Sequence, residues 1–279
     1  MTRVLREEAQ AGAWSSGSVV TIGAFDGVHL GHQRVLQLVR ELADARGLDA
    51  VCVTFDQHPA RVVRPDSAPK LLTGLDHKVE LLTDTELLDL VAVLHFDAER
   101  SRETADEFVR EVLVERLGAR MVVVGADFHF GRDRAGNVAM LDAVGADLGF
   151  EVLGLGLVAP PEDPDHVAYS STRIRRLLAD GDVAGAGALL GRHHAELDVD
   201  AGHAGDRGAS GRRAGTSDDG LRGSGSGPAE DEARYKLPQA RHLLRRLGLA
   251  LEFLDRAAGV ERRLVRGAGA QDRGGKRQA

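Results

Sequence analysis

The chain has 279 residues, of which 43% are hydrophobic and 28% charged, and its formal net charge is -7. This balance is usual for a water-soluble globular protein and argues against general nucleic-acid binding. The single cysteine, Cys52, excludes an internal disulfide framework and a multi-cysteine zinc site. No run of about 18 apolar residues occurs and the N-terminus is charged, so we expect neither a membrane span nor a secretory signal, and a cytoplasmic location.

The composition changes along the chain. Residues 1–230 carry 24 basic and 37 acidic side chains, whereas residues 231–279 carry 12 and 6. Glycine, serine, alanine and charge dominate residues 201–232, so this segment cannot bury enough surface to fold alone. We predict one folded domain over residues 1–192, a low-complexity linker over 193–234, a short basic helix within 235–266 and a disordered tail over 267–279. We interpret that helix as solvated or folded back rather than as a contact for nucleic acid or a membrane.

Short apolar runs alternate with helical periodicity through the first 192 residues. The expected strands are residues 18–23, 50–55, 90–96, 121–125 and 150–158. The expected helices cover residues 35–42, 71–82, 105–117, 138–148, 171–178 and 183–190. Strands separated by helices predict an α/β fold, a Rossmann-like parallel sheet with helices on both faces. Ligands of such sheets bind at the carboxyl ends of the strands.

The first motif, Gly-Ala-Phe-Asp-Gly-Val-His-Leu-Gly-His, spans residues 23–32 after the first expected strand. A helix start offers free amide groups to a phosphate, and His29 and His32 in the first turn would donate hydrogen bonds as charge builds in a transition state. The alternative is a pair of surface or capping histidines, and a metal site is weaker because no third ligand has suitable spacing. The pattern closely resembles the adenylyl/cytidylyl-transferase superfamily.

The second motif is Val-Thr-Phe-Asp-Gln-His-Pro, residues 53–59, just past the second expected strand. Asp56 and His58 are placed to meet a substrate, and Pro59 stiffens the loop. An ordinary turn at the end of a strand is the alternative interpretation.

The third motif covers residues 122–137, an apolar strand followed by a polar loop with Asp127, Phe128, Phe130 and Arg134. Two aromatic side chains are unusual in such a loop. They indicate either a local loop core or contact with a flat ring system, and the sequence leaves both open.

The fourth motif, residues 169–182, opens a helix with Ser170, Ser171 and Thr172. Hydroxyls at this position normally cap the helix. Together with Arg173 and Arg175 they also predict a second anion cradle, which would suit a nucleoside triphosphate.

In order and spacing, the four motifs resemble the FAD synthetase module of bacterial bifunctional riboflavin kinase/FMN adenylyltransferase proteins. The resemblance implies transfer of AMP from ATP to the phosphate of FMN, with Mg²⁺, giving FAD and pyrophosphate without a covalent intermediate. It implies catalytic roles for His29, His32 and Arg175. It implies that the nucleotide is bound by Gly23, Phe25, Asp26, Gly31, Ser170, Ser171 and Thr172. It implies that the flavin is bound by Asp56, His58, Pro59, Asp127, Phe128, Phe130 and Arg134.

The sequence departs from the family pattern in two loops. Proline is common where Gln57 stands, and arginine where His129 stands. Losing that permanent charge would weaken the binding of the acceptor phosphate or change its specificity. Two alternatives therefore stay open: a nucleotidyltransferase that uses CTP or another phosphate acceptor, and a non-catalytic binding relic.

Family members usually continue after Gly191-Arg192 into a riboflavin kinase β-barrel. Residues 193–279 contain neither the Gly-Phe-Pro-Thr-Ala-Asn motif of that domain nor a series of alternating strands. We therefore expect adenylyl transfer without riboflavin kinase activity.

Overall fold

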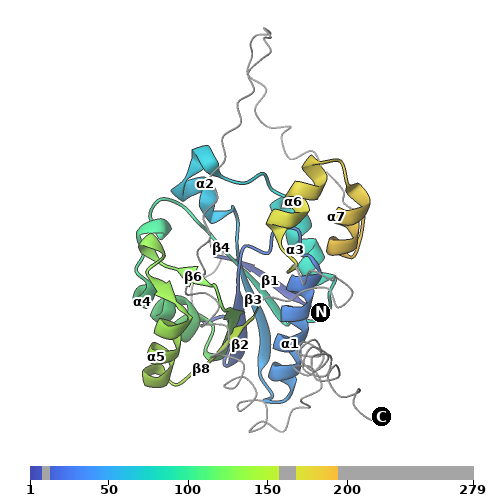
Figure 1. Cartoon of the computed structure of the whole chain (residues 1–279). Coiled ribbons are helices and arrows are strands. Elements are labelled where there is room, and N and C mark those ends of the chain that lie inside the picture. Colours follow the sequence, from blue (N-terminus) through green and yellow to red (C-terminus); the bar gives the residue numbers. More distant parts are fainter. Residues whose placement is uncertain (8–12, 157–167, 194–279) are drawn as a thin grey trace, which may run out of the picture.

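A computed structural model describes residues 1–7, 13–156 and 168–193 of the chain (Figure 1). From residue 194 on, the predicted linker, basic helix and tail lie outside the described residues. Within the described ranges, no helix combines the length and the apolar character needed to cross a membrane.

Six parallel strands form one sheet in the order β1-β4-β3-β2-β5-β8. The strands are β1 (Arg3–Arg6), β2 (Ser18–Ile22), β3 (Asp49–Phe55), β4 (Leu90–Leu94), β5 (Ala119–Gly125) and β8 (Glu151–Leu155). Every residue of β2 and of β4 is buried, which explains why neither strand alternates apolar and exposed polar positions; β4 is wholly apolar, and in β2 only the buried Ser18 and Thr21 are polar. The predicted α/β Rossmann-like fold is confirmed.

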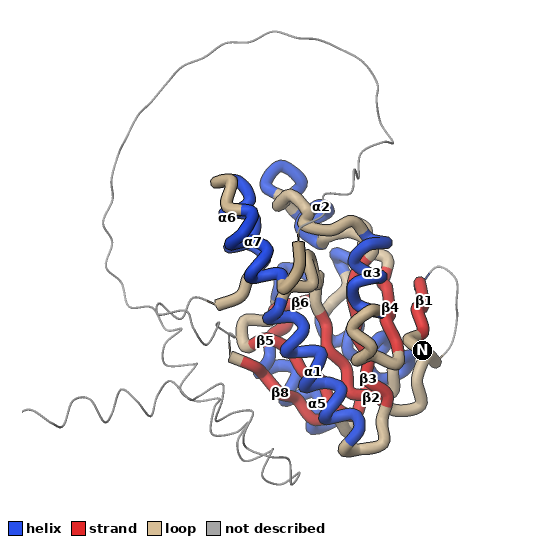
Figure 2. The backbone as a smooth tube through the Cα atoms, turned by 90° about the vertical axis from the view of Figure 1, so that its right-hand side faces the viewer, coloured by secondary structure: helices blue, strands red, loops and turns tan. Residues whose placement is uncertain are grey.

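Helices cover both faces of this sheet and its carboxyl end (Figures 1 and 2). They are α1 (Leu30–Asp44), α2 (Pro59–Val63), α3 (Leu75–Thr83), α4 (Ala105–Phe108), α5 (Val138–Leu148), α6 (Ser171–Ala179) and α7 (Val183–Leu190). From Val109 to Arg116 the helix begun by α4 widens to bonds between residues five apart, such as Leu117 N–H to the Val112 carbonyl. A short antiparallel pair, β6 (His129–Phe130) and β7 (Gly136–Asn137), lies in the loop after β5.

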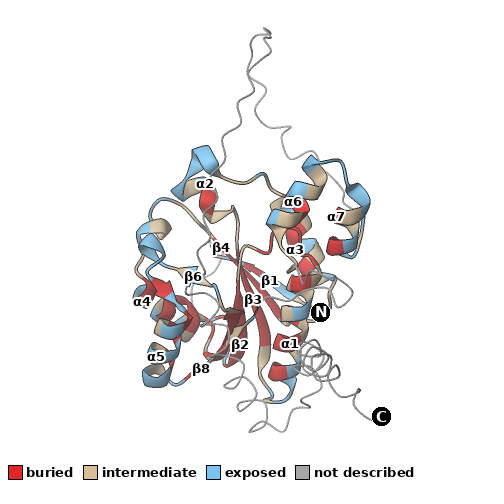
Figure 3. Ribbon diagram, viewed as in Figure 1, coloured by how far each residue is buried: buried red, intermediate tan, exposed pale blue. Residues whose placement is uncertain are grey.

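Alternate residues of each strand supply two apolar layers. Val20 of β2 packs in one layer with Phe108 of α4 and with α5. Val19 packs in the other with Leu36 of α1 and Leu82 of α3. Burying a leucine fully stabilises the fold by roughly 1.5–3 kcal/mol, so these contacts fix the helices that frame the site. Figure 3 shows the buried strands between the two helical layers.

The sequence predictions miss some boundaries for tertiary reasons. Strand β1 was not expected, because only Leu5 of its four residues is buried. The predicted helix 71–82 begins at Leu75, since the backbone amides of Leu72 and Thr73 bind a distant carboxylate. Strand β8 ends at Leu155, before the predicted end at residue 158.

The order of the strands in the sheet indicates where a ligand site is expected. From β2 the chain moves outward through β3 and β4, and then returns to the other side of β2 as β5. The crevice where such an order reverses is the usual ligand site of parallel α/β sheets. The neighbouring strands β3, β2 and β5 end side by side, so the loops that follow them begin next to one another, below α2, α6 and α7 (Figure 1).

Candidate active site

The turn between β2 and α1 has unusual backbone geometry. Phe25 and Val28 have φ values of 48° and 36°, in the left-handed region that bulky and β-branched residues rarely adopt. The Gly27 amide donates to Thr73 Oγ1 at 3.1 Å, and the Arg192 guanidinium donates to the Gly27 carbonyl at 2.6 Å. The surroundings therefore hold a conformation that the chain alone would avoid, which is typical of a preorganised site.

His29 and His32 lie where the sequence predicted them, at the start of α1. His29 is the N-cap residue and is only 5% exposed, and its Nδ1 accepts a hydrogen bond from the His32 amide at 3.2 Å. Because Nδ1 is an acceptor, the proton of the neutral ring is on Nε2. The two rings stack with centroids 3.6 Å apart, and Phe25 packs against His32 at 5.0 Å.

Both imidazoles are neutral at pH 7. Burial lowers the pKa of His29 from 6.5 to about 4, although the nearby Asp26 carboxylate opposes the shift. Burial also lowers the pKa of His32 well below 6.5, and the neighbouring His29 and Lys78 add to this effect. Neutral rings stack without charge repulsion, and each keeps one N–H group to donate.

The lowered pKa of His29 predicts a pH-dependent stability. Between pH 6.5 and pH 4 the unfolded chain binds a proton that the folded chain does not, so stability falls as the pH is lowered. His29 alone should reduce the free energy of unfolding by about 2 kcal/mol between pH 7 and pH 5. Urea denaturation at both pH values measures this change.

The matched variant is His29→Asn, since asparagine caps helices well but does not titrate. Losses from titrating carboxylates are common to both proteins and cancel in the comparison. An equal pH dependence in the variant and the parent would contradict the assignment.

Asp26 and Arg175 form a buried ion pair beside the histidines. The Asp26 side chain is 5% exposed and accepts from the amides of Leu72 at 2.9 Å and Thr73 at 3.0 Å, and from the Arg175 guanidinium. Arg175 Nε also donates to the Lys70 carbonyl at 2.6 Å. The carboxylate predicted to line the nucleotide pocket thus joins the β2–α1 turn to α6 and to the loop before α3.

The start of α6 is pinned to the same turn. Ser170 is the N-cap and accepts from the Arg173 amide at 3.1 Å, as its position in the sequence predicted. The Ser171 hydroxyl donates to the Asp26 carbonyl at 2.8 Å, whereas Thr172 is exposed. One hydroxyl therefore caps the helix, one fixes it to the β2–α1 turn, and the third faces solvent.

Gly31 allows the two helix starts to approach each other. A Cβ atom on Gly31 would lie 2.8 Å from the Tyr169 Cβ and 3.1 Å from the His29 ring. The first turn of α1 therefore lies against the residue that precedes the α6 cap. Gly23, by contrast, would place a Cβ at 3.2 Å from the Phe25 ring.

The predicted flavin residues fall into two groups, on either side of the β2 loop. After β3, His58 caps α2 by accepting from the Ala60 amide at 3.1 Å, and Pro59 is the first residue of that helix. Asp56 turns toward the end of β4, where its Oδ2 lies 2.6 Å from His95 Nδ1 and its Oδ1 accepts from the Phe96 amide.

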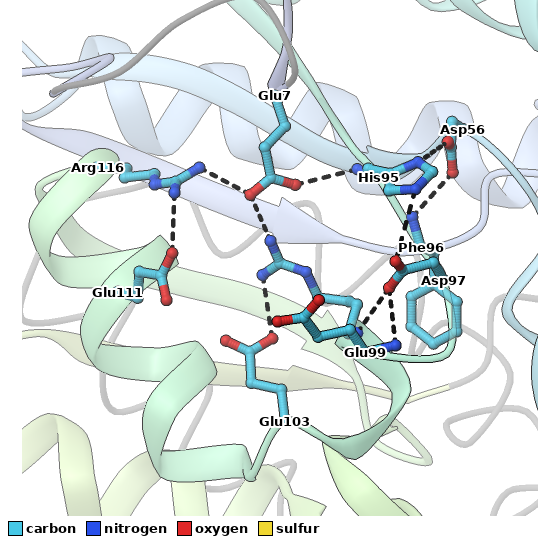
Figure 4. Close-up of polar contacts among 10 residues, drawn as sticks. Glu7, Asp56, His95, Phe96, Asp97, Glu99, Glu103, Glu111 and Arg116 are labelled. Carbon is cyan, nitrogen blue, oxygen red and sulfur yellow. Dashed lines mark hydrogen bonds and ion pairs between the residues drawn. The ribbon is translucent and has the colours of Figure 1, made fainter.

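An ion network supports this end of β4 (Figure 4). Glu7, just past β1, accepts from the His95 amide at 3.0 Å, from Arg116 at 2.8 Å and from Arg100. Arg100 also donates to Glu103 at 3.0 Å. The edge strand β1 thereby fixes the loop that holds the partner of Asp56.

The second flavin group follows β5. Phe128 stacks on Phe130 with centroids 5.3 Å apart, Phe130 contacts Phe108 at 5.7 Å, and both loop rings pack against the sheet core. The local loop core is therefore present, and contact of the same loop with a flat ring system stays a prediction. Asp127 and Arg134 are exposed beside these rings.

His129 stands in this loop where the family pattern has arginine. It is exposed, and its Nδ1 lies 2.8 Å from the Asp127 carbonyl. The imidazole is therefore available at the surface of the loop beside the predicted flavin residues.

Sequence reasoning missed two cations at the site. Arg192, after α7, donates to the carbonyls of Gly27, Val28 and Leu190, and burial lowers its pKa. Lys78 is buried on α3 and binds two carbonyls. The sequence did contain an indication that Lys78 is buried, since this lysine lies on the apolar face of its helix with Val79 and Leu82.

Comparisons with known proteins agree with this geometry. A family model described as FAD synthetase matches residues 13–173. The chain is similar to bifunctional riboflavin kinase/FMN adenylyltransferases of Escherichia coli (strain K12), at 35% identity, and Haemophilus influenzae, at 38%; each match covers 63% of this chain and 54% and 56% of the relative. The chain thus spans about half the length of these curated relatives. A solved structure described as a macrolide-efflux protein from Streptococcus pneumoniae is also similar, with a TM-score of 0.56 and 27% identity over 68% of this chain and 60% of that chain.

Proposed function

Because this chain belongs to the FAD synthetase family, we propose that it transfers AMP from ATP to the phosphate of FMN, giving FAD and pyrophosphate. The observation that carries the proposal is the pair of helix starts held against each other. One presents His29 and His32, and the other presents Ser170 to Thr172. Two such starts offer amide groups and partial positive charge to a triphosphate.

In the proposed reaction an oxygen of the FMN phosphate attacks the α-phosphorus of ATP. The bond from that phosphorus to the bridging oxygen breaks in line, and pyrophosphate leaves with the electron pair. His29, with Nδ1 accepting inside the protein, donates from Nε2 to a phosphate oxygen. Donors fixed in advance stabilise the transition state without reorganising during the reaction.

Arg175 keeps donors for this task. A guanidinium carries five N–H groups on three nitrogen atoms. Within the described residues, Nε binds the Lys70 carbonyl and one terminal nitrogen binds Asp26. The other terminal nitrogen is the donor proposed to reach the triphosphate.

The described side chains do not form a Mg²⁺ cage. In the part of the chain that the structure describes, no group of three or more His, Cys, Asp or Glu side chains gathers around one point. The Asp26 carboxylate is already occupied by Arg175 and two amides. We therefore treat Mg²⁺ as part of the ATP substrate, held by phosphate oxygens, and assign it no protein site.

For the acceptor, we propose that FMN lies between the loop after β3 and the loop after β5. Asp56, His58 and Pro59 would border it on one side, and Asp127, Phe128, Phe130 and Arg134 on the other. We further propose that the chain does not phosphorylate riboflavin. The support is the sequence of residues 193–279, in which glycine, serine, alanine and charge dominate the first part.

The test is incubation of the purified full chain with Mg²⁺, ATP or CTP, and FMN or riboflavin, followed by chromatography of the flavins. FAD from ATP and FMN, with no product from riboflavin, supports the proposal. A flavin dinucleotide formed only with CTP would mean that CTP, and not ATP, is the nucleotide donor. FAD or FMN made from riboflavin would overturn the proposed absence of kinase activity. Tight flavin binding without pyrophosphate release would indicate a binding relic.

A further inference from the structure

Lys78 is a buried cation that the reaction scheme above does not use. Its side chain comes from α3 and the residue is 7% exposed. The ammonium Nζ donates to the carbonyls of Phe55 at 2.7 Å and Ala24 at 3.2 Å. Burial lowers its pKa, since in the described chain its hydrogen-bond partners are neutral carbonyls and not carboxylates.

The two carbonyls lie on different sides of the site. The last ladder bond between β2 and β3 runs from the Gly23 amide to the Val53 carbonyl at 3.1 Å. Beyond it the strands separate: one continues through Ala24 to the histidine turn, and the other through Phe55 to the Asp56–His58 loop. Lys78 occupies the fork and binds both branches. Together with the Thr54 hydroxyl, which donates to the Ala24 carbonyl at 3.2 Å, it therefore sets the spacing between the nucleotide loop and one acceptor loop.

Lys78 is also one of the residues that line a small cavity. Its volume is about 20 Å³, and its polar lining comes from Lys78, Asp26, Asp56, His58 and Thr73. This is room for about one water molecule. An ammonium has three N–H donors, and the described residues occupy two of them. The third can therefore act through the cavity on a group between the two loops.

The nearby carboxylates already have close partners. Asp26 is paired with Arg175, and Asp56 lies against His95. Within the described residues no carboxylate is hydrogen-bonded to the ammonium, although the nearby charges of Asp26 and Asp56 partly oppose the lowering of its pKa by burial. A buried charge in that position is costly, and a further anion would reduce the cost. Phosphates placed at the adjoining loops would offset this cost in the loaded enzyme.

We propose that Lys78 is a positioning residue for the transfer step: it holds the nucleotide loop and the acceptor loop at reacting distance and directs positive charge at the phosphates between them. This inference rests on the proposed adenylyl transfer. A residue that aligns two substrates contributes to turnover more than to the binding of either one.

The first experiment compares the full chain with Lys78→Met, which keeps the apolar stem and removes the charge. We expect kcat for FAD formation to fall about 100-fold while KM for ATP and for FMN each change less than about threefold, because small misalignments reduce turnover by about this factor. Arg120→Met is the matched control, since that cation is exposed near the start of β5, away from the carboxyl end of the sheet, and it should leave kcat and both KM values unchanged.

The second experiment separates alignment from folding. Lys78→Ala is assayed with added methylammonium or ethylammonium, and with tetramethylammonium, which carries charge but no N–H donor. We expect saturable recovery of kcat by at least about tenfold with the primary amines and none with tetramethylammonium. Lys78→Arg, which keeps charge and donors, should retain more activity than Lys78→Met. Thermal melts identify any variant that does not fold.

The outcomes distinguish the two proposals. A parent chain that makes no FAD from ATP and FMN overturns the proposed function. A parent that makes FAD, with Lys78→Met within threefold of its kcat, overturns the role of Lys78 alone. Equal losses in kcat and in substrate binding, without amine rescue, would also overturn that role.

Discussion

Replacing both histidines of the first α1 turn, as His29→Ala with His32→Ala, should lower kcat for FAD formation by at least about 1000-fold. The reason is that two preorganised N–H donors, aimed from a buried helix start, are lost together, and each such donor typically contributes about 100-fold or more. The rings stack with centroids 3.6 Å apart, and the His29 ring accepts a hydrogen bond from the His32 backbone amide, so we expect the single variants to be nearly as inactive as the double variant. Steady-state assays of all three variants measure this.

The control for that experiment is His77→Ala, a half-buried histidine on α3 outside the site, which should keep parental turnover. ATP affinity, measured by calorimetry without FMN, should change much less than kcat in the double variant, because the donors act mainly on transition-state charge. A double variant that is folded and retains more than a tenth of parental kcat would remove the histidines from the mechanism.

The central fold was predictable because its signals are local. Strands such as β2 are buried on both faces and read as apolar runs, and α5 matches its predicted limits, 138–148, because Asn137 caps its start and Gly149 ends it with a φ of 83°. Strand β1 was missed because its burial depends on pairing with β4, far along the chain. The widened segment from Val109 to Arg116 was predicted as part of an ordinary helix because Val109, Val112 and Leu113 lie three and four positions apart.

At the candidate site, too, local contacts were predictable from the sequence and long-range contacts were not. The side chains of His29 and Ser170 cap their helices by accepting from amides three positions later, so the sequence alone predicted their positions at the helix starts, while their roles in the reaction stay predictions. Contacts between residues far apart in the sequence could not be predicted from it. Arg175 meets a carboxylate 149 positions earlier, and Asp56 meets a histidine 39 positions later. No periodicity or motif encodes such contacts; the order of strands in the sheet creates them.

Disrupting the Asp26–Arg175 pair should be the most destabilising change at the site. Asp26→Asn leaves the guanidinium without its counter-charge, and Arg175→Met leaves a nearly inaccessible carboxylate with neutral donors only. Breaking a buried pair from one side typically costs about 3–5 kcal/mol, because an uncompensated charge remains. We therefore expect each variant to lose about 3 kcal/mol in free energy of unfolding, measured by urea denaturation at pH 7.

The double variant decides whether this loss reflects the pair itself. With both charges gone, no uncompensated charge is left, so Asp26→Asn with Arg175→Met should cost about 2 kcal/mol less than the sum of the single changes. The control is the exposed pair of Asp106 on α4 and Arg110 in the widened segment that follows it, and its cycle should give a coupling of only about 0.3–0.5 kcal/mol. Additive losses at Asp26 and Arg175 would mean that the two act separately, with the backbone amides of Leu72 and Thr73 holding the turn. Coupled losses would instead show that the charge predicted to clamp phosphate also assembles the site around it.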